Sequence, residues 1–331
     1  MVRDQRVHSQ TILLFAAALA GCGFSGIAWG QAENYPNRAV RAIVPFPPGG
    51  SLDFNARAIQ DRFSALLGQQ VVIDNRGGAS GTLGTGIAMR SSPDGYTLLL
   101  HTVPFVTSPI LYSSAGYDPV TDFAPISMLS TVPMAVSVHP SLPVRSVKEL
   151  LALAKSRPGE LNYGSAGIGT NSHITGELFN LLGRTNVVPI HFKGGGPSIA
   201  AAVSGEVQVS FSNVSQTVIM VAAKRLRPLA VSSLKPSPAL PGVPTVAEAG
   251  LPGFEFVAWH GLLAPKGTPP AIIALLNEKL RATVSDPVVM QRFEKGGLDA
   301  VTGSPKEYGA YLQSEQEKWK RVIRERNIKA E

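Results

Sequence analysis

Cysteine is almost absent from this chain, whose 331 residues include a single one, Cys22. A disulfide framework needs cysteines in pairs, and a thiolate zinc site needs several, so the sequence excludes both. The histidines after residue 30 never fall at metal-ligand spacing; they are His101, His139, His173, His191 and His260. We therefore expect neither a metal centre nor a cofactor.

Charged residues are also few. The chain carries 30 basic and 23 acidic residues, a formal net charge of +7, and the basic residues are dispersed. A nucleic-acid binder would show a basic stripe with interleaved aromatic residues, so nucleic acid is excluded as a partner. Hydrophobic residues make up 44% and charged residues 16%, which is too apolar for a disordered chain. The 33 glycines and 26 prolines are spread without a period and indicate many turns between short elements.

Motifs for nucleotide phosphates are missing: the chain has no G-x-x-x-x-G-K-[ST] and no G-x-G-x-x-G after a strand. Ser165 follows Tyr163-Gly164, whereas a nucleophile elbow has glycine where Tyr163 stands. An exported α/β hydrolase using Ser165 is the alternative from another functional class. The carboxylates of Asp118 and Asp122 lie in a Pro- and Thr-rich stretch that is typical of a solvated loop.

The first thirty residues have the order of a secretory signal: two arginines, an apolar run over 12–20, and Ala28-Trp29-Gly30. Cleavage after Gly30 would leave small residues at the −3 and −1 positions. Two other interpretations stay open. Cys22 ends a stretch similar to a bacterial lipobox and would then be lipidated, or residues 11–30 form an uncleaved anchor. All three place the remaining chain outside the cytoplasmic membrane, and we expect a periplasmic protein.

Short apolar strands alternate with amphipathic helices from residue 40 onward. The segment Val40–Pro45 predicts a strand, and apolar residues then recur at helical spacing until Gly68. A second strand-loop-helix block follows at 161–183. Such alternation favours parallel α/β sheets, and the two blocks predict two similar lobes.

Glycine-rich loops stand between predicted strands and helices at Pro47–Gly50, Gly164–Thr170 and Gly194–Gly196. Ligands of open α/β sheets bind beyond the carboxyl ends of strands, where such loops meet helix N-termini. Free backbone N–H groups and the positive end of a helix favour a carboxylate or a phosphate there. Three such loops in a chain with an export signal favour a binding protein over an enzyme.

Several longer motifs carry a family resemblance from about Tyr35 to the C-terminus. They are Val44–Gly50 with Asp53 and Arg57, Asn75–Gly81, Asp94–Thr97, His139–Val144, Glu149-Leu150 with Pro158-Gly159, Pro241–Glu248, and Trp259 with Gly261-Leu262. In this order and spacing they resemble the Bug family of periplasmic solute receptors, the substrate-binding components of tripartite tricarboxylate transporters. Two positions depart from the family: Phe192 stands for a usual tyrosine, and Ser212 stands where an acidic residue is frequent.

The resemblance implies a two-lobed periplasmic binding protein fold of the α/β class, type II-like, with the ligand cleft between lobes joined by two hinge crossings. Residues 1–30 would be the signal peptide. The first lobe would comprise residues 31–136 and 258–331, with Trp259–Ala264 as a strand completing it, and the second lobe residues 137–257.

The resemblance also implies the ligand site. Its residues would be Phe46, Pro47, Pro48, Gly49, Gly50, Ser51 and Asp53 from the first lobe, and Ser165, Ala166, Gly167, Thr170, His173 and Asn213 from the second. Phe46 would form an apolar wall and Asp53 would brace its loop. Other interpretations remain: Asp53 as a first-turn helix acid, Asn213 as an N-cap, Phe46 as a core residue and His173 as a surface residue.

The implied function is that of a monomeric, non-enzymatic receptor. It would bind a small carboxylate, an organic or amino acid, and deliver it to the membrane subunits of a tripartite permease. A receptor that feeds a sensor instead of a permease is the other interpretation, which the sequence does not separate from the first.

Overall fold

The computed structural model describes residues 34–326 and 328–329, so the expected signal segment lies outside the described residues. The strands are β1 (Val40–Val44), β2 (Val71–Asn75), β3 (Thr97–His101), β4 (Phe123–Val138), β5 (Asn162–Ser165), β6 (Val188–His191), β7 (Val209–Asn213), β8 (Arg227–Val231), β9 (Val257–Pro265) and β10 (Asp299–Ala300). The helices are α1 (Ser51–Leu67), α2 (Thr82–Met89), α3 (Pro104–Leu111), α4 (Val147–Ser156), α5 (Asn171–Gly183), α6 (Gly195–Ser204), α7 (Val214–Ala222), α8 (Pro270–Val284), α9 (Pro287–Lys295) and α10 (Pro305–Arg326). Within the described ranges, no helix combines the length and the apolar character needed to cross a membrane.

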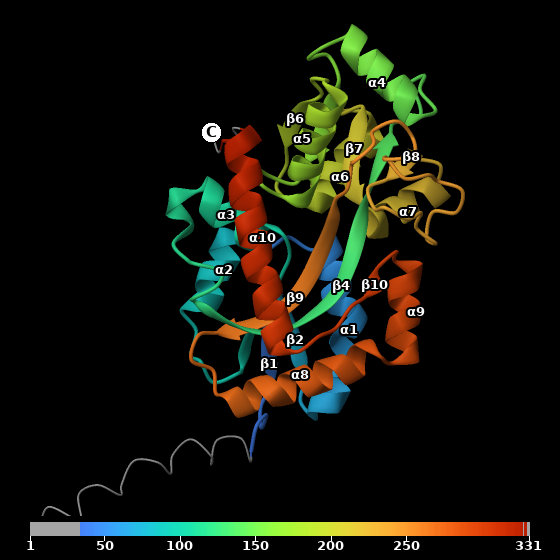
Figure 1. Ribbon diagram of the computed structural model, residues 1–331. Helices are drawn as coiled ribbons and strands as arrows, with labels where there is room; N and C mark the ends of the chain where they lie inside the picture. The colour runs from blue at the N-terminus through green and yellow to red at the C-terminus, as the bar shows by residue number, and fades with distance from the viewer. Residues whose placement is uncertain (1–33, 327, 330–331) are drawn as a thin grey trace, which may run out of the picture.

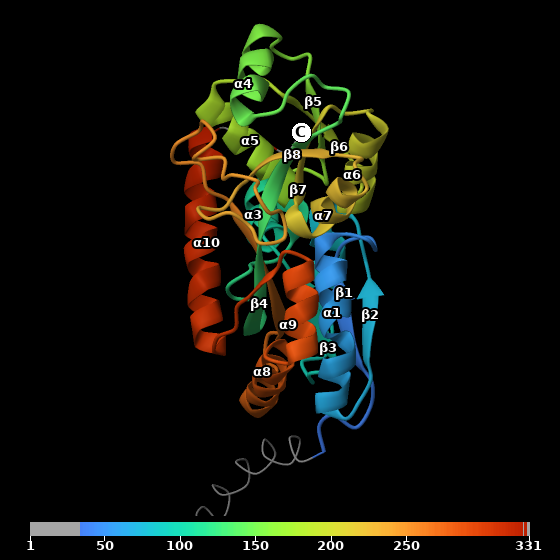
Figure 2. The same cartoon turned by 90° about the vertical axis from the view of Figure 1, so that its right-hand side faces the viewer.

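Two α/β lobes stand one above the other, and β4 runs through both (Figures 1 and 2). The strand order is β2-β1-β3-β9-β4 in the lower sheet, where β1 is parallel to β2 and β3. The strand order in the upper sheet is β8-β4-β7-β5-β6. From Phe123 to Pro133, β4 pairs with β9, and from Met134 to Val138 it pairs with β7 and β8. One long strand therefore links the two sheets.

The first strand-loop-helix unit forms where the sequence predicts it. Leu52, Ala56, Ile59 and Phe63 face the core of the lower lobe at helical spacing and are all buried. Gly68 ends α1 in the left-handed conformation, with a φ of 69°, which glycine adopts without steric cost. Burial of this apolar face holds α1 against the sheet and fixes the position of its N-terminus.

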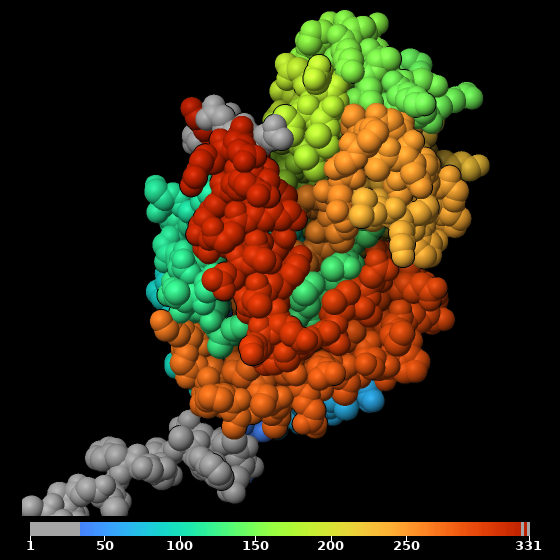
Figure 3. Space-filling model, in the orientation of Figure 1, coloured from blue at the N-terminus to red at the C-terminus, as the bar shows by residue number. Residues whose placement is uncertain are grey.

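The upper lobe has a buried cluster of its own, built from Tyr163, Phe179 and Phe211. The rings of Tyr163 and Phe211 meet edge to face with centroids 5.1 Å apart. A larger cluster fills the lower lobe, and α10 packs along β4 and α3 there. In the space-filling view, α10 runs up one side of the molecule, and part of β4 stays visible beside it (Figure 3). The upper lobe thus has a core of its own, and the larger cluster extends from the lower lobe to Ile174 and Val214 where the lobes meet.

Candidate functional site

A pocket with a cavity volume of about 60 Å³ lies between the lobes. Its lining residues are Phe46, Gly50, Ser51, Leu52, Thr102, Pro104, Met134, Ala166, Thr170, Asn171, Ser172, Gly195, Ser198, Phe211, Ser212, Asn213, Gln216 and His260. None of these described lining residues has a carboxylate, ammonium or guanidinium group.

Five helices begin at this pocket. The lower lobe brings the first turns of α1, at Gly50–Leu52, and of α3, at Pro104. The upper lobe brings those of α5 at Thr170–Ser172, of α6 at Gly195, and of α7 at Asn213. The first backbone N–H groups of a helix have no intrahelical acceptor, and the helix dipole makes this end positive. The helix dipoles therefore favour negative charge in this pocket, although no charged side chain lines it.

Two asparagines of the upper lobe leave polar atoms unsatisfied at the pocket. Asn171 and Asn213 are 8% and 7% exposed, and the Oδ1 atom of each has no hydrogen-bond partner. Asn171 Nδ2 donates to Thr102 Oγ1 of the other lobe at 3.4 Å. Asn213 holds the N-cap position of α7, but its side chain makes no capping hydrogen bond. A buried polar atom without a partner is costly, so both amides favour a polar ligand in the pocket.

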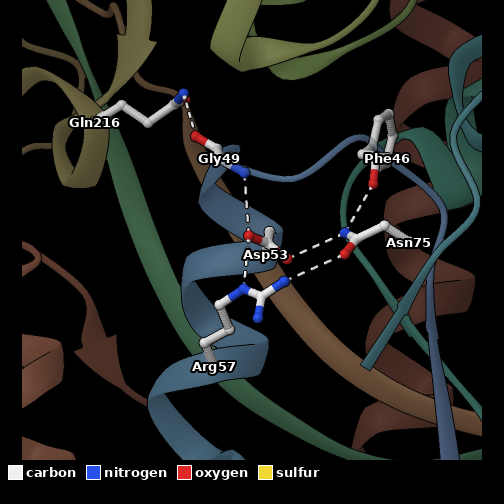
Figure 4. Close-up of polar contacts among 6 residues, drawn as sticks. All are labelled: Phe46, Gly49, Asp53, Arg57, Asn75 and Gln216. Carbon is white, nitrogen blue, oxygen red and sulfur yellow. Dashed lines mark hydrogen bonds and ion pairs between the residues drawn. The ribbon is translucent and has the colours of Figure 1, made fainter. Parts of the chain in front are cut away.

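Asp53 holds the loop before α1 in place (Figure 4). Its carboxylate is buried and accepts hydrogen bonds from Gly49 N at 3.0 Å, Arg57 Nε at 3.0 Å and Asn75 Nδ2 at 3.1 Å. Burial disfavours the charged form, but the bonds from Arg57, Gly49 and Asn75 outweigh it and lower the pKa of Asp53. Gly49 supplies the left-handed turn, with a φ of 83°. The loop therefore presents Gly50 and Ser51 to the pocket in a fixed geometry.

We expect Asp53→Asn to lower the free energy of unfolding by about 1 kcal/mol, because the amide retains one of the two acceptor oxygens and loses the charge. Ligand affinity should fall about fivefold, the equivalent of that energy. Urea unfolding and titration calorimetry measure the two effects. Asp61→Asn is the matched control, since this side chain lies on the same helix and is 79% exposed. Equal behaviour of the two variants would contradict the bracing role.

The loop before α5 is held together by its own side chains. Ser165 Oγ donates to Gly167 O at 3.0 Å, and Thr170 Oγ1 donates to the same oxygen at 2.6 Å. His173 Nδ1 accepts from Gly169 N at 3.1 Å. Burial, with a smaller contribution from His191, lowers the pKa of His173 to about 4 and keeps this acceptor unprotonated. The Ser165 hydroxyl thus donates to a backbone carbonyl of its own loop. A nucleophilic serine would instead donate to a general base.

The structure divides the predicted site residues into two groups. Six line the pocket: Phe46, Gly50, Ser51, Ala166, Thr170 and Asn213. The other seven do not line the pocket but lie within three residues of a lining residue in the sequence: Pro47, Pro48, Gly49, Asp53, Ser165, Gly167 and His173.

Other lining residues were not predicted. Thr102 directly follows β3, and Asn171 directly follows the predicted loop Gly164–Thr170, so the rule for open α/β sheets could have identified both. His260 lies inside an apolar strand, where no local pattern marks it. Within residues 34–326 and 328–329, no three His, Cys, Asp or Glu side chains form a group that could hold a metal ion.

The lobes contact each other directly around the pocket. Ser215 Oγ donates to Ser51 Oγ at 3.1 Å, and Gln216 Nε2 donates to Gly49 O at 3.4 Å. Thr107 Oγ1 donates to Gly169 O at 2.8 Å. These contacts join α7 to the α1 loop and α3 to the α5 loop, so the structure is a closed arrangement of the two lobes.

A pocket between two α/β lobes, lined by the N-termini of five helices, is the arrangement of the periplasmic binding protein fold. Over residues 55–328 the sequence matches the family described as "Tripartite tricarboxylate transporter family receptor". The chain therefore belongs to this family of receptors, and the resemblance to Bug proteins is confirmed.

Known relatives are similar over nearly their whole length. Protein BugT of Bordetella pertussis is 36% identical over 301 residues, which cover 90% of this chain and 92% of BugT. The structure of Rpa4515 from R. palustris with adipate has a TM-score of 0.87 at 35% identity, covering 89% of this chain and 99% of that one. MatC from Rhodopseudomonas palustris with bound malate has a TM-score of 0.83 at 30% identity, covering 87% and 100%. The predicted two-lobed α/β fold is confirmed.

Proposed function

We propose that this protein is an extracytoplasmic receptor that binds a small carboxylate between its lobes and delivers it to a tripartite tricarboxylate-type permease. The observation that carries the proposal is the convergence of five helix N-termini on a pocket without charged side chains. Each N-terminus stabilises a partly buried anion by up to about 2 kcal/mol. The relatives with adipate and malate support the same ligand class.

Closure of the lobes would complete the site. We assign residues 31–136 and 258–331 to the first lobe and 137–257 to the second. The change of β4 partners after Pro133, three residues before this boundary, and the return of the chain at β9 support a division in this region. A ligand that contacts both lobes shifts an open–closed equilibrium toward the closed state.

Within the site, we assign ligand contacts to five lining residues, namely Gly50, Ser51, Ala166, Thr170 and Asn213, with Phe46 as an apolar wall. The remaining predicted residues would hold the two loops. The closed shape would also be the signal that a membrane partner reads.

Export is the remaining part of the proposal. Membership in a periplasmic receptor family supports a signal in the first thirty residues. The intact mass of protein from the cell envelope distinguishes cleavage after Gly30 from lipidation at Cys22. A full-length chain found in the cytoplasm would contradict export.

A thermal-shift screen of mono-, di- and tricarboxylates, with malate and adipate included, tests the function. A ligand at a hundredfold excess over its Kd stabilises the folded state by about 2.7 kcal/mol, which raises the melting temperature by several degrees. We expect such a shift for at least one small carboxylate and no turnover of it. A screen without any shift would overturn the proposal, and hydrolysis of an ester by Ser165 would favour the alternative.

A further inference from the structure

His260 connects both lobes through one hydrogen-bond chain at the pocket. It lies in β9, is fully buried and lines the pocket. Its Nδ1 lies 3.3 Å from Asn55 Nδ2 and 3.0 Å from Ser130 Oγ. Its Nε2 lies 3.3 Å from the Oγ of Ser51, the first residue of α1. Ser215 of the other lobe donates to the same Oγ at 3.1 Å.

The partners of Nδ1 fix the proton on the opposite side of the ring. The Asn55 side-chain amide lies with Nδ2 toward His260 Nδ1, and its Oδ1 is buried without a partner. In this orientation the amide nitrogen only donates, so Nδ1 must present its lone pair to it. Ser130 Oγ already accepts from Asn55 Nδ2 at 2.5 Å, and its own hydrogen is then directed at Nδ1. Burial lowers the pKa of His260 to about 3, so the ring is neutral at physiological pH. A neutral imidazole has one N–H, which must therefore be on Nε2.

The same logic determines the role of the Ser51 hydroxyl. A hydroxyl oxygen has two lone pairs and one hydrogen. One lone pair accepts from His260 Nε2–H and the other from the Ser215 hydroxyl. The hydrogen of Ser51 is then available to the pocket that this residue lines.

We propose that His260 is a positioning residue that fixes the Ser51 hydroxyl as a hydrogen-bond donor to a carboxylate oxygen of the ligand. This inference rests on the proposed function and extends it to specificity. A preset donor favours an acceptor oxygen and rejects an ammonium or amide nitrogen at the same place. Ser215 completes the arrangement only when the lobes are closed, so the donor is fully set in the ligand-binding state.

A double-mutant cycle tests the coupling between the two residues. The titrant is malate or adipate, whichever gives the larger thermal shift. Asparagine at position 260 retains an acceptor for Asn55 and Ser130 but has no group near Ser51. We expect His260→Asn to lower affinity about tenfold in the wild-type background and less than about twofold in Ser51→Ala, because the group it positions is then missing. Equal losses in both backgrounds would overturn the proposal.

The conservative variant separates positioning from a purely structural role. The side-chain amide of glutamine reaches the place of the imidazole Nε2 and can donate to Ser51. We therefore expect His260→Gln to stay within about threefold of the wild-type affinity. If His260→Gln lost as much affinity as His260→Asn while both variants remained folded, the Nε2–H bond would not be the relevant interaction.

Nitrogen-15 NMR of the histidine-labelled wild-type protein tests the inference without ligand or substitution. The chemical shifts of the ring nitrogens report which one carries the hydrogen. We expect the Nε2–H tautomer for His260, and an Nδ1–H tautomer would overturn the proposal. The two failures are distinguishable, because a failed carboxylate screen would overturn the proposed function and would leave the tautomer measured on the unliganded protein unchanged.

Discussion

Between pH 8 and pH 5.5, three buried histidines should together lower the free energy of unfolding by about 4 kcal/mol. Burial lowers the pKa of His101 and His260 to about 3 and that of His173 to about 4. All three stay neutral in the folded protein at pH 5.5, whereas in the unfolded chain they bind protons below a pKa near 6.5. The unfolded state thus binds about three more protons than the folded state, so the free energy of unfolding falls as the pH falls. One pH unit below 6.5, each histidine contributes about 1.4 kcal/mol.

Urea unfolding at several pH values measures this effect. Glu177 works in the opposite direction, because burial raises the pKa of its carboxyl. The variant His101→Gln isolates the histidine contribution: its free energy of unfolding should depend on pH less steeply than that of the wild type, by about 1.4 kcal/mol over the same range. Parallel curves for the two proteins would contradict the buried, neutral state of His101.

Gly194→Val should lower ligand affinity at least about tenfold, or 1.4 kcal/mol. Gly194 precedes α6 in the upper lobe with a φ of 114°. A Cβ atom there would lie 3.0 Å from Cδ and 3.2 Å from Cγ of Pro47, a rigid ring of the lower lobe. Overpacking of this kind costs about 1–3 kcal/mol, and it burdens only the closed state, in which the lobes touch.

Gly205→Val is the matched control for this substitution. Gly205 ends the same helix, also with a positive φ, of 85°, and a Cβ atom there would meet only the His139 ring of its own lobe, at 3.5 Å. Backbone strain should lower the stability of both variants, but only Gly194→Val should lose affinity in titration calorimetry. If both variants bound a carboxylate as tightly as the wild type, lobe closure at Pro47 would not be part of binding.

The sequence predicted the regular units of the fold and missed its longest strand. β1 with α1, and β5 with α5, follow from apolar periodicity and from glycines at the ends of the elements. In β4, Pro125 and Pro133 interrupt the usual strand pattern, and the register shifts twice against β9. Pro109 lies inside α3 and likewise interrupts the sequence pattern from which this helix could have been predicted. These elements are stabilised by tertiary packing, which local propensity does not record.

The candidate site was predictable as far as it depends on local order. Gly50 and Thr170 come directly before a helix, so their place at a strand-loop-helix junction identifies them. The bond from Ser215 to Ser51 depends on how two lobes meet, and no spacing in the chain encodes that distance. The role of His260 could not be predicted for the same reason, because its partners Ser51 and Asn55 in α1 and Ser130 in β4 are far from it in the sequence.

The central claim is that helix N-termini and neutral donors recognise a carboxylate. Titration calorimetry of the acid with the largest thermal shift, compared with its primary amide, tests this claim most directly. In the amide used here every carboxylate is replaced by a primary amide, so the compound has nearly the same shape but no charge, and its NH₂ groups would face N–H donors in the pocket. We expect the amide to bind at least about a hundredfold more weakly, a difference of about 2.7 kcal/mol. An amide that bound within about threefold of the acid would contradict the account.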